Sequence, residues 1–523
     1  MRRWVLPVVL LAVLATVAIT ALVLGAEVGE SDPAASDSPQ PSASAEASGA
    51  SDPRVTEAPQ RALAPYYTQV LDWQPCEDAA ECATLDVPVH YADPDGPTIR
   101  LSLLRVPAGG ERVGSLVVNP GGPGAPGTDY AAAADQVFRQ PLLDAFDIVG
   151  FDPRGTGDSS PVDCLSDADL DDYIATDPDP DTVAEASEYL AWTERMGAGC
   201  AANTGELIGH LSTVEAARDM DVLRGALGED QLRYFGASYG TKLGATYAEL
   251  FPDRVGRLVL DGAVDVSLSS RELTLQQAAG FETALRAFVE NCVEESSACF
   301  LGDSVQSGLE RISAFLQEVD RRPLPTGGDR ELTEGNALYG IIAPLYNRDY
   351  WFLLSAALRA GLDGDGAVLM RLSDLYTSRN PDGSYADNST EALYAINCLD
   401  DPYALPGEQV AEQYGDFEQA SPTLGRVFAW MLTGCGGVQV ESAEKAPQIR
   451  AEGAAPIVVV GTTRDPATPF LWASALADQL DSGVLIRRDG DGHTGYNAGN
   501  DCVDEAVERY LVEGVAPEDG LAC

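Results

Sequence analysis

Residues 233–250, RYFGASYGTKLGATYAEL, decide the fold of this chain. The short strand-like run at 233–235 leads into GASYG at 236–240, and a helical pattern follows in which Leu243, Tyr247 and Leu250 share one face. A Gly-x-Ser-x-Gly sequence between a strand and a helix is typical of a nucleophile elbow, a sharp turn that holds its serine in a strained backbone conformation. The flanking glycines leave room for this turn because they carry no Cβ. The segment therefore predicts Ser238 as a nucleophile.

Four more apolar runs indicate a parallel sheet around this elbow. They are SLVVN (115–119), FDIVGF (146–151), RLVLD (257–261) and IVVVG (457–461). Helical stretches lie between them, including residues 213–227, for which Thr213 is the predicted N-cap. This alternation predicts an α/β fold. About 200 residues of mainly helical pattern separate the last two runs, too many for a loop, and we expect a helical insertion at the carboxyl edge of the sheet.

A serine nucleophile needs a base and an acid that orients it. In this kind of site the chain order is nucleophile, acid, base, and two of the three histidines, His90 and His210, precede the serine. His493, in GDGHTGY, is therefore the candidate base. Asp465, in GTTRDPATP after the last apolar run, is the candidate acid, and Asp261 at the end of RLVLDG is the alternative.

An oxyanion hole needs backbone N–H groups directed at the developing negative charge. One candidate is the N–H of Tyr239, directly after the nucleophile. The other should come from NPGGPG (119–124), where we favour Gly122 and place Gly121 second. A phosphate-binding loop is the alternative for this segment, but neither a Walker lysine nor a dinucleotide-binding fingerprint accompanies it.

Composition limits the class of protein. The 523 residues include 33 Lys and Arg against 82 Asp and Glu, a formal net charge of −49, which excludes a nucleic-acid binder. Ten cysteines, an even number, predict disulfides; the pairing stays open, although neighbours in chain order would give short loops. Three histidines and the lack of a Cys-x-x-Cys motif leave little for a zinc site, so we expect no metal and no cofactor.

The N-terminus predicts export. Met1-Arg2-Arg3 precedes an apolar run to Ala26, which reads as a signal peptide or a retained N-terminal anchor. Residues 27–60 are rich in Ser, Ala and Pro and predict a disordered linker. We expect a secreted or surface-anchored protein that meets a membrane only through this first segment.

Several motifs, in this order, carry a family resemblance: PGGPG, FDPRGTGDSS, GASYG, LDG, GTTRDPATP and GHTGY. From about Trp73 to Cys523 the chain resembles the exported tripeptidyl aminopeptidases of actinobacteria, which are α/β-hydrolases related to proline iminopeptidases. The resemblance implies an α/β-hydrolase fold with a large, mainly helical cap after the sixth strand. The expected parts are 1–26 signal or anchor, 27–60 linker, 61–262 first part of the core, 263–450 cap, and 451–523 second part of the core.

The resemblance implies a serine exopeptidase that releases short peptides, such as tripeptides, from free N-termini. Carried over, Ser238, Asp465 and His493 form the catalytic set, and Gly122 and Tyr239 donate to the oxyanion. AINCLD (395–400) is similar to a cap segment of the family and makes Asp400 a candidate anchor for the substrate ammonium. Asn-Pro at 119–120 departs from the His-Gly of proline iminopeptidases and argues against strict N-terminal proline specificity.

Two other functions stay open on the sequence alone. The same catalytic set would serve an esterase or a lipase-like hydrolase. An inactive surface protein that binds ligands in an old catalytic pocket is the alternative from another class.

Overall fold

The computed structural model describes residues 58–76, 79–295 and 299–523. The predicted signal or anchor at 1–26, and the linker up to residue 57, lie outside the described residues.

The described residues form a ten-stranded sheet, with strand order β1-β2-β3-β5-β4-β6-β7-β10-β11-β12. The strands are β1 Gln74–Pro75, β2 Glu81–Pro88, β3 Thr98–Val106, β4 Gly114–Asn119, β5 Phe146–Phe151, β6 Leu232–Ala237, β7 Val255–Asp261, β10 Ile457–Arg464, β11 Gly483–Asp491 and β12 Leu521–Ala522. Neighbours from β5 to β12 pair in parallel, and β1, β2, β3 and β5 pair antiparallel. Each of the five apolar runs of the sequence falls in a parallel strand, so the predicted α/β sheet is confirmed.

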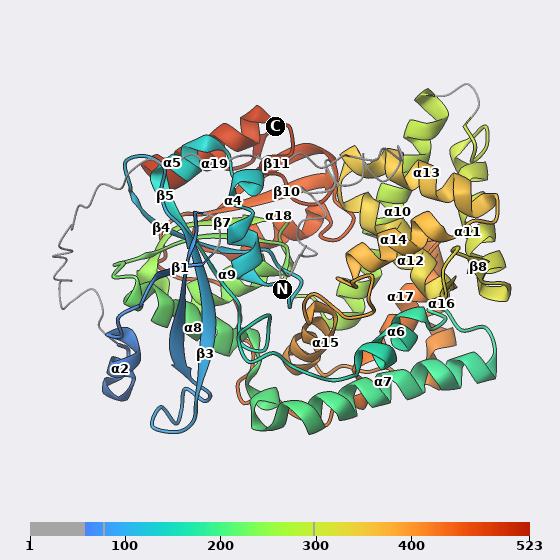
Figure 1. The fold of residues 1–523 in the computed structure, drawn as a ribbon. Coiled ribbons are helices and arrows are strands. Elements are labelled where there is room, and N and C mark those ends of the chain that lie inside the picture. The colour runs from blue at the N-terminus through green and yellow to red at the C-terminus, as the bar shows by residue number, and fades with distance from the viewer. Residues whose placement is uncertain (1–57, 77–78, 296–298) are drawn as a thin grey trace, which may run out of the picture.

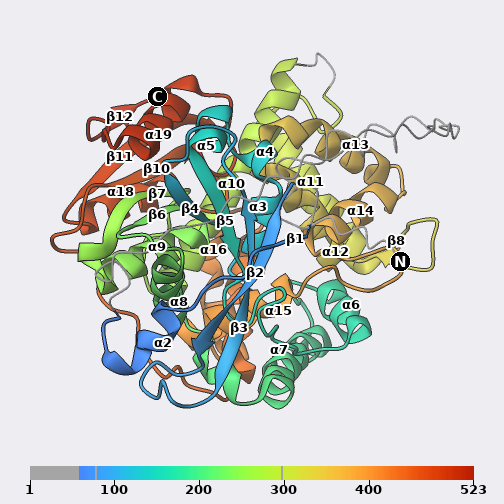
Figure 2. The ribbon, with the colours of Figure 1, turned by 60° about the vertical axis from the view of Figure 1, so that its left-hand side comes forward.

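Helices cover both faces of this sheet (Figures 1 and 2). One face packs against α8 (Thr213–Ala226), α9 (Tyr239–Leu250) and α18 (Phe470–Gln479); the other packs against α3 (Gly127–Ala132), α4 (Ala134–Val137), α5 (Gln140–Ala145) and α19 (Asp501–Glu513). Successive residues of β4 alternate between the two cores, with Val117 in one and Leu116 and Val118 in the other. Both faces of the central strands are buried, which explains their continuous apolar sequence.

The start of α8 corrects one prediction. Its N-cap is Ser212, whose hydroxyl accepts the N–H of Glu215 at 3.4 Å. Thr213 is the first residue of the helix, and its hydroxyl contacts Asp400.

A helical region with its own core lies beside the sheet. It follows β7, which is the sixth strand of the described chain when the two-residue strand β1 is not counted. Its helices are α10 Ser270–Glu295, α11 Val305–Arg321, α12 Glu334–Ile342, α13 Trp351–Leu362, α14 Ala367–Tyr376, α16 Tyr414–Ala420 and α17 Gly425–Met431, with a short β8–β9 pair at Leu324–Pro325 and Glu331–Leu332. Helix α15, Ser389–Asp400, comes from the same stretch of chain, but its buried side chains belong to the core that contains α8 and α9. Two helices from before β6, α6 (Asp167–Ala175) and α7 (Val183–Thr204), join this region, and α7 runs along its lower edge in Figure 1.

Five disulfides link the cysteines in the described residues, as expected for an even number of them. The pairs are Cys76–Cys82, Cys164–Cys200, Cys292–Cys299, Cys398–Cys435 and Cys502–Cys523. Each cysteine pairs with its neighbour in chain order. Among the described helices, none has both the length and the apolar character needed to cross a bilayer.

Candidate active site

Ser238 occupies the turn between β6 and α9. Its backbone angles, φ 56° and ψ −124°, are strained for a residue with a side chain. Its N–H donates to the carbonyl oxygen of Asp261, at the end of the neighbouring strand β7, at 2.9 Å. The elbow therefore places the serine side chain at the carboxyl edge of the sheet, half-exposed.

Asp465 and His493 meet at the same edge. The Nδ1 of His493 lies 2.9 Å from both carboxylate oxygens of Asp465, which is 2% exposed. The backbone N–H groups of Ala467, Thr468 and Thr494 donate to the same carboxylate at 2.8–3.1 Å. The Thr468 hydroxyl also donates to it, at 3.0 Å. These bonds fix the carboxylate, which in turn fixes the plane and the tautomer of the imidazole.

The ring of His493 lies against Gly262, the residue that follows β7. A Cβ placed on Gly262 would lie 3.2 Å from the Cε1 of His493, and Gly262 directly follows Asp261, the residue whose carbonyl binds the N–H of Ser238. Within the described part of the chain, the Nε2 of His493 is buried and has no hydrogen-bond partner. The hydroxyl of Ser238 makes no hydrogen bond to this nitrogen in the structure, and a base nitrogen without other partners is available to accept a proton.

Two carboxylates set the charge state of His493. Burial lowers its pKa, but the charge and hydrogen bond of Asp465 and the charge of Asp261 outweigh burial, so the net pKa is raised above the ordinary value of 6.5. Asp261, the alternative acid, does not bond the ring: it accepts the N–H groups of Gly495 and Tyr496 at 2.7 and 2.9 Å. Its burial raises its own pKa to about 6. Asp465 is therefore the carboxylate bonded to the candidate base, and Asp261 is bonded to the loop that carries it.

The glycine-rich turn after β4 lies against the elbow. Gly121 has φ +103°, and a Cβ there would lie 2.8 Å from the Cβ of Ser238 and 3.0 Å from the nitrogen of Tyr239. Only glycine permits this approach. The Asn119 side chain accepts the N–H of Gly121 at 3.0 Å, whereas no acceptor among the described residues takes the N–H of Gly122. The turn thus lies directly against Ser238 and the nitrogen of Tyr239, and the N–H of Gly122 stays a predicted oxyanion donor.

The helical region contributes contacts that the sequence did not indicate. The carbonyl of Tyr346, just after α12, accepts the backbone N–H of His493 at 2.8 Å. Arg348 pairs with Asp491, two residues before the histidine, at 2.7 Å. A backbone carbonyl contact has no sequence signature, so neither residue could be singled out beforehand.

His90, His210 and Asp400 have interaction partners other than Asp465 and His493. His210 bonds Glu215 at 3.0 Å and its ring lies 4.9 Å from that of His90, so these two histidines form a separate pair. The carboxylate of Asp400 accepts the N–H of Thr213 at 2.9 Å and pairs with the ammonium of Lys242 at 2.7 Å. Its side chain is 5% exposed and fully engaged within the protein. The role of Asp400 as an anchor for the substrate ammonium stays a prediction, which these internal bonds do not favour.

Comparison with known proteins places this site in a family. The serine protease Hip1 of Mycobacterium tuberculosis is 36% identical over 501 residues, which are 90% of this chain and 94% of that protein. A family described as TAP-like protein matches residues 421–523, the part with Asp465 and His493. The chain belongs to the tripeptidyl aminopeptidase (TAP) family of α/β-hydrolases.

Two further relatives show the range of named activities in this family. A TAP of Streptomyces coelicolor is 29% identical over 468 residues, 87% of this chain and 86% of that protein. A protein of M. tuberculosis named carboxylesterase B is 36% identical over 494 residues, 90% of this chain and 93% of its own length. The resemblance and the α/β-hydrolase fold predicted from the motifs are confirmed, and this TAP-family chain is an enzyme of the serine hydrolase type.

Proposed function

We propose that this TAP-family enzyme is an exported serine aminopeptidase that releases short peptides, such as tripeptides, from free N-termini. The observation that carries the proposal is the bonded pair of Asp465 and His493, whose second ring nitrogen is buried and unpaired, at the sheet edge that also holds the strained elbow of Ser238. The relatives named serine protease and tripeptidyl aminopeptidase support a serine peptidase as the reaction class.

The geometry gives each residue a step. The Oγ of Ser238 attacks the scissile carbonyl carbon while the Nε2 of His493 takes the hydroxyl proton. The oxygen becomes an oxyanion, which the N–H groups of Tyr239 and Gly122 stabilise. Collapse of this intermediate breaks the C–N bond, and the imidazolium gives its proton to the leaving amine. Water, deprotonated by the same nitrogen, then releases the peptide from the serine ester and restores the hydroxyl.

Charge favours a cationic chain end as the substrate. A net charge of −49 produces a negative potential that attracts the ammonium of a free N-terminus and repels a carboxylate. The helical region contacts the histidine loop through Tyr346, and in this proposal it closes one end of the substrate site. Together these features support cleavage from the N-terminus.

A comparison of three substrates tests this function. A tripeptide p-nitroanilide with a free N-terminus, its N-acetylated twin and a p-nitrophenyl ester are offered to the wild type and to Ser238→Ala. We expect hydrolysis of the free peptide, at least tenfold slower hydrolysis of the acetylated one, and none by the variant. Equal hydrolysis of both peptides would contradict an aminopeptidase.

The relative named carboxylesterase B favours an esterase as the second candidate. Efficient ester hydrolysis without peptide hydrolysis would support it. A fluorophosphonate probe separates both enzymes from an inactive binding protein, because only a reactive Ser238 is labelled. Mass spectrometry of products from mixed oligopeptides gives the length of the released unit.

Export is part of the same proposal. Five disulfides among the described residues fit an extracytoplasmic protein. N-terminal sequencing of the protein from culture medium and from membranes distinguishes cleavage of residues 1–26 from a retained anchor. Recovery from the cytosol alone would contradict export.

A further inference from the structure

The glycine-rich turn after β4 has little conformational preference of its own. Gly121, Gly122 and Gly124 take φ angles of 103°, 102° and 98°, a region that residues with a side chain rarely adopt. Glycine reaches these angles freely and also leaves them freely, because it has the widest backbone freedom of all residues. The predicted oxyanion donor at Gly122 therefore depends on the groups that fix the turn.

Asn119, the last residue of β4, fixes the start of this turn. The residue is 1% exposed, and its side-chain Oδ1 accepts the N–H of Gly121 at 3.0 Å. Pro120, between them, has no N–H, so the N–H of Gly121 is the first backbone donor after the strand. A side-chain oxygen that accepts the N–H two residues further on forms an Asx turn, which asparagine and aspartate both favour. The side chain of Asn119 thus holds the turn at the point where it leaves the sheet.

The same side chain also packs against the nucleophile elbow. A Cβ on Gly240 would lie 2.9 Å from the Oδ1 of Asn119 and 2.9 Å from its carbonyl oxygen. A Cβ on Gly121 would lie 2.8 Å from the Cβ of Ser238 and 3.0 Å from the nitrogen of Tyr239. Asn119 therefore contacts the elbow two residues after the serine, and the N–H that it accepts belongs to the residue that lies against the serine.

The amide nitrogen of Asn119 explains why the charge of this residue matters. Within the described residues, its Nδ2 is buried and lacks a hydrogen-bond partner. A buried donor without an acceptor lowers stability. An aspartate would accept the same N–H without this unpaired donor, but it would bring a negative charge to the elbow. Because the proposed reaction forms an oxyanion beside the N–H of Tyr239, a neutral acceptor is the form that favours catalysis.

We propose that Asn119 is a positioning residue for the oxyanion hole, whose neutral Oδ1 holds the turn against the elbow without adding negative charge there. The inference rests on the acyl-enzyme step of the proposed function, a step that a peptidase and an esterase share. Asn119 acts through Gly121 and Gly122 and not by contact with the substrate. Its loss should therefore lower kcat and leave KM nearly unchanged, because an oxyanion hole acts on the transition state more than on the bound substrate.

Kinetics of three variants of the full-length protein test this role. Asn119→Ala removes the acceptor, Asn119→Ser keeps a shorter one, and Asn119→Asp keeps the acceptor and adds charge. We expect kcat to fall at least about tenfold in the alanine and aspartate variants, with KM within about twofold of wild type. The serine variant should recover part of the loss, because its hydroxyl can accept the same N–H. The order should be the same for the peptide p-nitroanilide, the p-nitrophenyl ester and the rate of fluorophosphonate labelling, since all three place an oxygen in the hole.

A buried asparagine outside the sheet is the matched control. Asn336, on α12, is 2% exposed, and its Nδ2 donates to the hydroxyl of Ser373 at 3.3 Å. Asn336→Ala should lower Tm, while kcat of the folded protein stays that of the wild type. The proposal is wrong if folded Asn119→Ala keeps kcat within about twofold of wild type, or if it changes KM alone.

The outcomes separate this inference from the proposed function. A wild type that cleaves the ester but no peptide would contradict the aminopeptidase, and the variants would still test Asn119 on the ester. A wild type that reacts with none of the three reagents would contradict both. If Asn119→Ala does not fold, Asn119→Asp decides, because it keeps the hydrogen bond to the turn. Wild-type kcat in that variant would show that the acceptor need not be neutral and would overturn the proposal.

Discussion

The ring of Tyr346 stands edge-on to the imidazole of His493, with centroids 5.3 Å apart and an interplanar angle of 88°. The same residue accepts the backbone N–H of the histidine through its carbonyl, so one residue of the helical region contacts both the main chain and the side chain of the candidate base. Movement of the helical region against the sheet would therefore move the base.

Truncation of Tyr346 tests this coupling. Tyr346→Ala keeps the carbonyl contact but removes the ring, and misplacement of a catalytic group costs about 10- to 100-fold in kcat/KM. Tyr346→Phe loses only the contact of its hydroxyl with Tyr376, 3.3 Å away, and should remain close to wild type. Steady-state kinetics on the peptide p-nitroanilide measure both. Wild-type kinetics for Tyr346→Ala would show that the ring does not position the base.

Asp465→Asn should reduce catalysis and leave the fold unchanged. An amide cannot stabilise the imidazolium and favours the wrong tautomer of His493, so we expect kcat to fall by about 10⁴-fold. Fluorophosphonate labelling of Ser238 should slow in parallel, while circular dichroism stays that of the wild type. A loss of less than tenfold would transfer the orienting role to another carboxylate.

The pH dependence should follow His493. Only the neutral imidazole acts as a base, so kcat/KM should fall as pH drops through its pKa, which lies above 6.5 because the charges of Asp465 and Asp261 outweigh burial. Asp261→Asn removes one of those charges and should move this acidic limb to lower pH. A pH–rate profile of both proteins measures the shift. An unchanged or higher midpoint in the variant would contradict the electrostatic role of Asp261.

We expect Asp400 to stabilise the folded protein rather than to bind the substrate. Asp400→Asn breaks the ion pair with Lys242 and should lower the free energy of unfolding by about 1–3 kcal/mol while KM stays unchanged. Asp401→Asn changes the exposed neighbouring acid and is the control. A large increase in KM without a change in Tm would instead restore Asp400 as an anchor of the substrate ammonium.

The sequence predicted the elements whose side chains are uniformly buried. All six residues of β5 are buried, so the strand reads as a continuous apolar run. Strands β2 and β3, toward one side of the sheet, mix buried and exposed residues and carry charges such as Asp86 and Arg100, so they have no continuous apolar run. The sequence does not predict β11 for a similar reason, since its exposed residues include Arg487 and Asp489.

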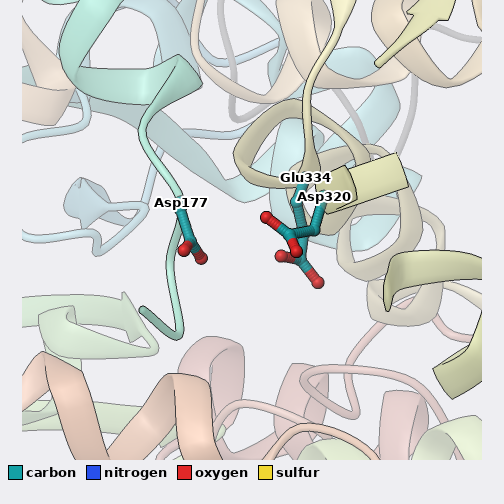
Figure 3. Close-up of side chains that lie close together, drawn as sticks. All are labelled: Asp177, Asp320 and Glu334. Atoms are coloured by element: carbon teal, nitrogen blue, oxygen red, sulfur yellow. The ribbon is translucent and has the colours of Figure 1, made fainter. Parts of the chain in front are cut away.

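The residues of the candidate site likewise include some with a sequence signature and some without one. Ser238, His493 and Asp465 could be chosen because an elbow has a sequence signature and because few histidines compete. The contact of Tyr346 with His493 depends on which helices pack together, and so does the approach of the carboxylates of Asp177, Asp320 and Glu334 (Figure 3). No local sequence pattern records that packing.

The order of the disulfides has a consequence for how the chain matures. Because each cysteine pairs with the next one in sequence, a chain that emerges from its N-terminus can close every bond before a competing thiol follows. Correct oxidation then requires only an oxidant, without an isomerase to rearrange mismatched pairs.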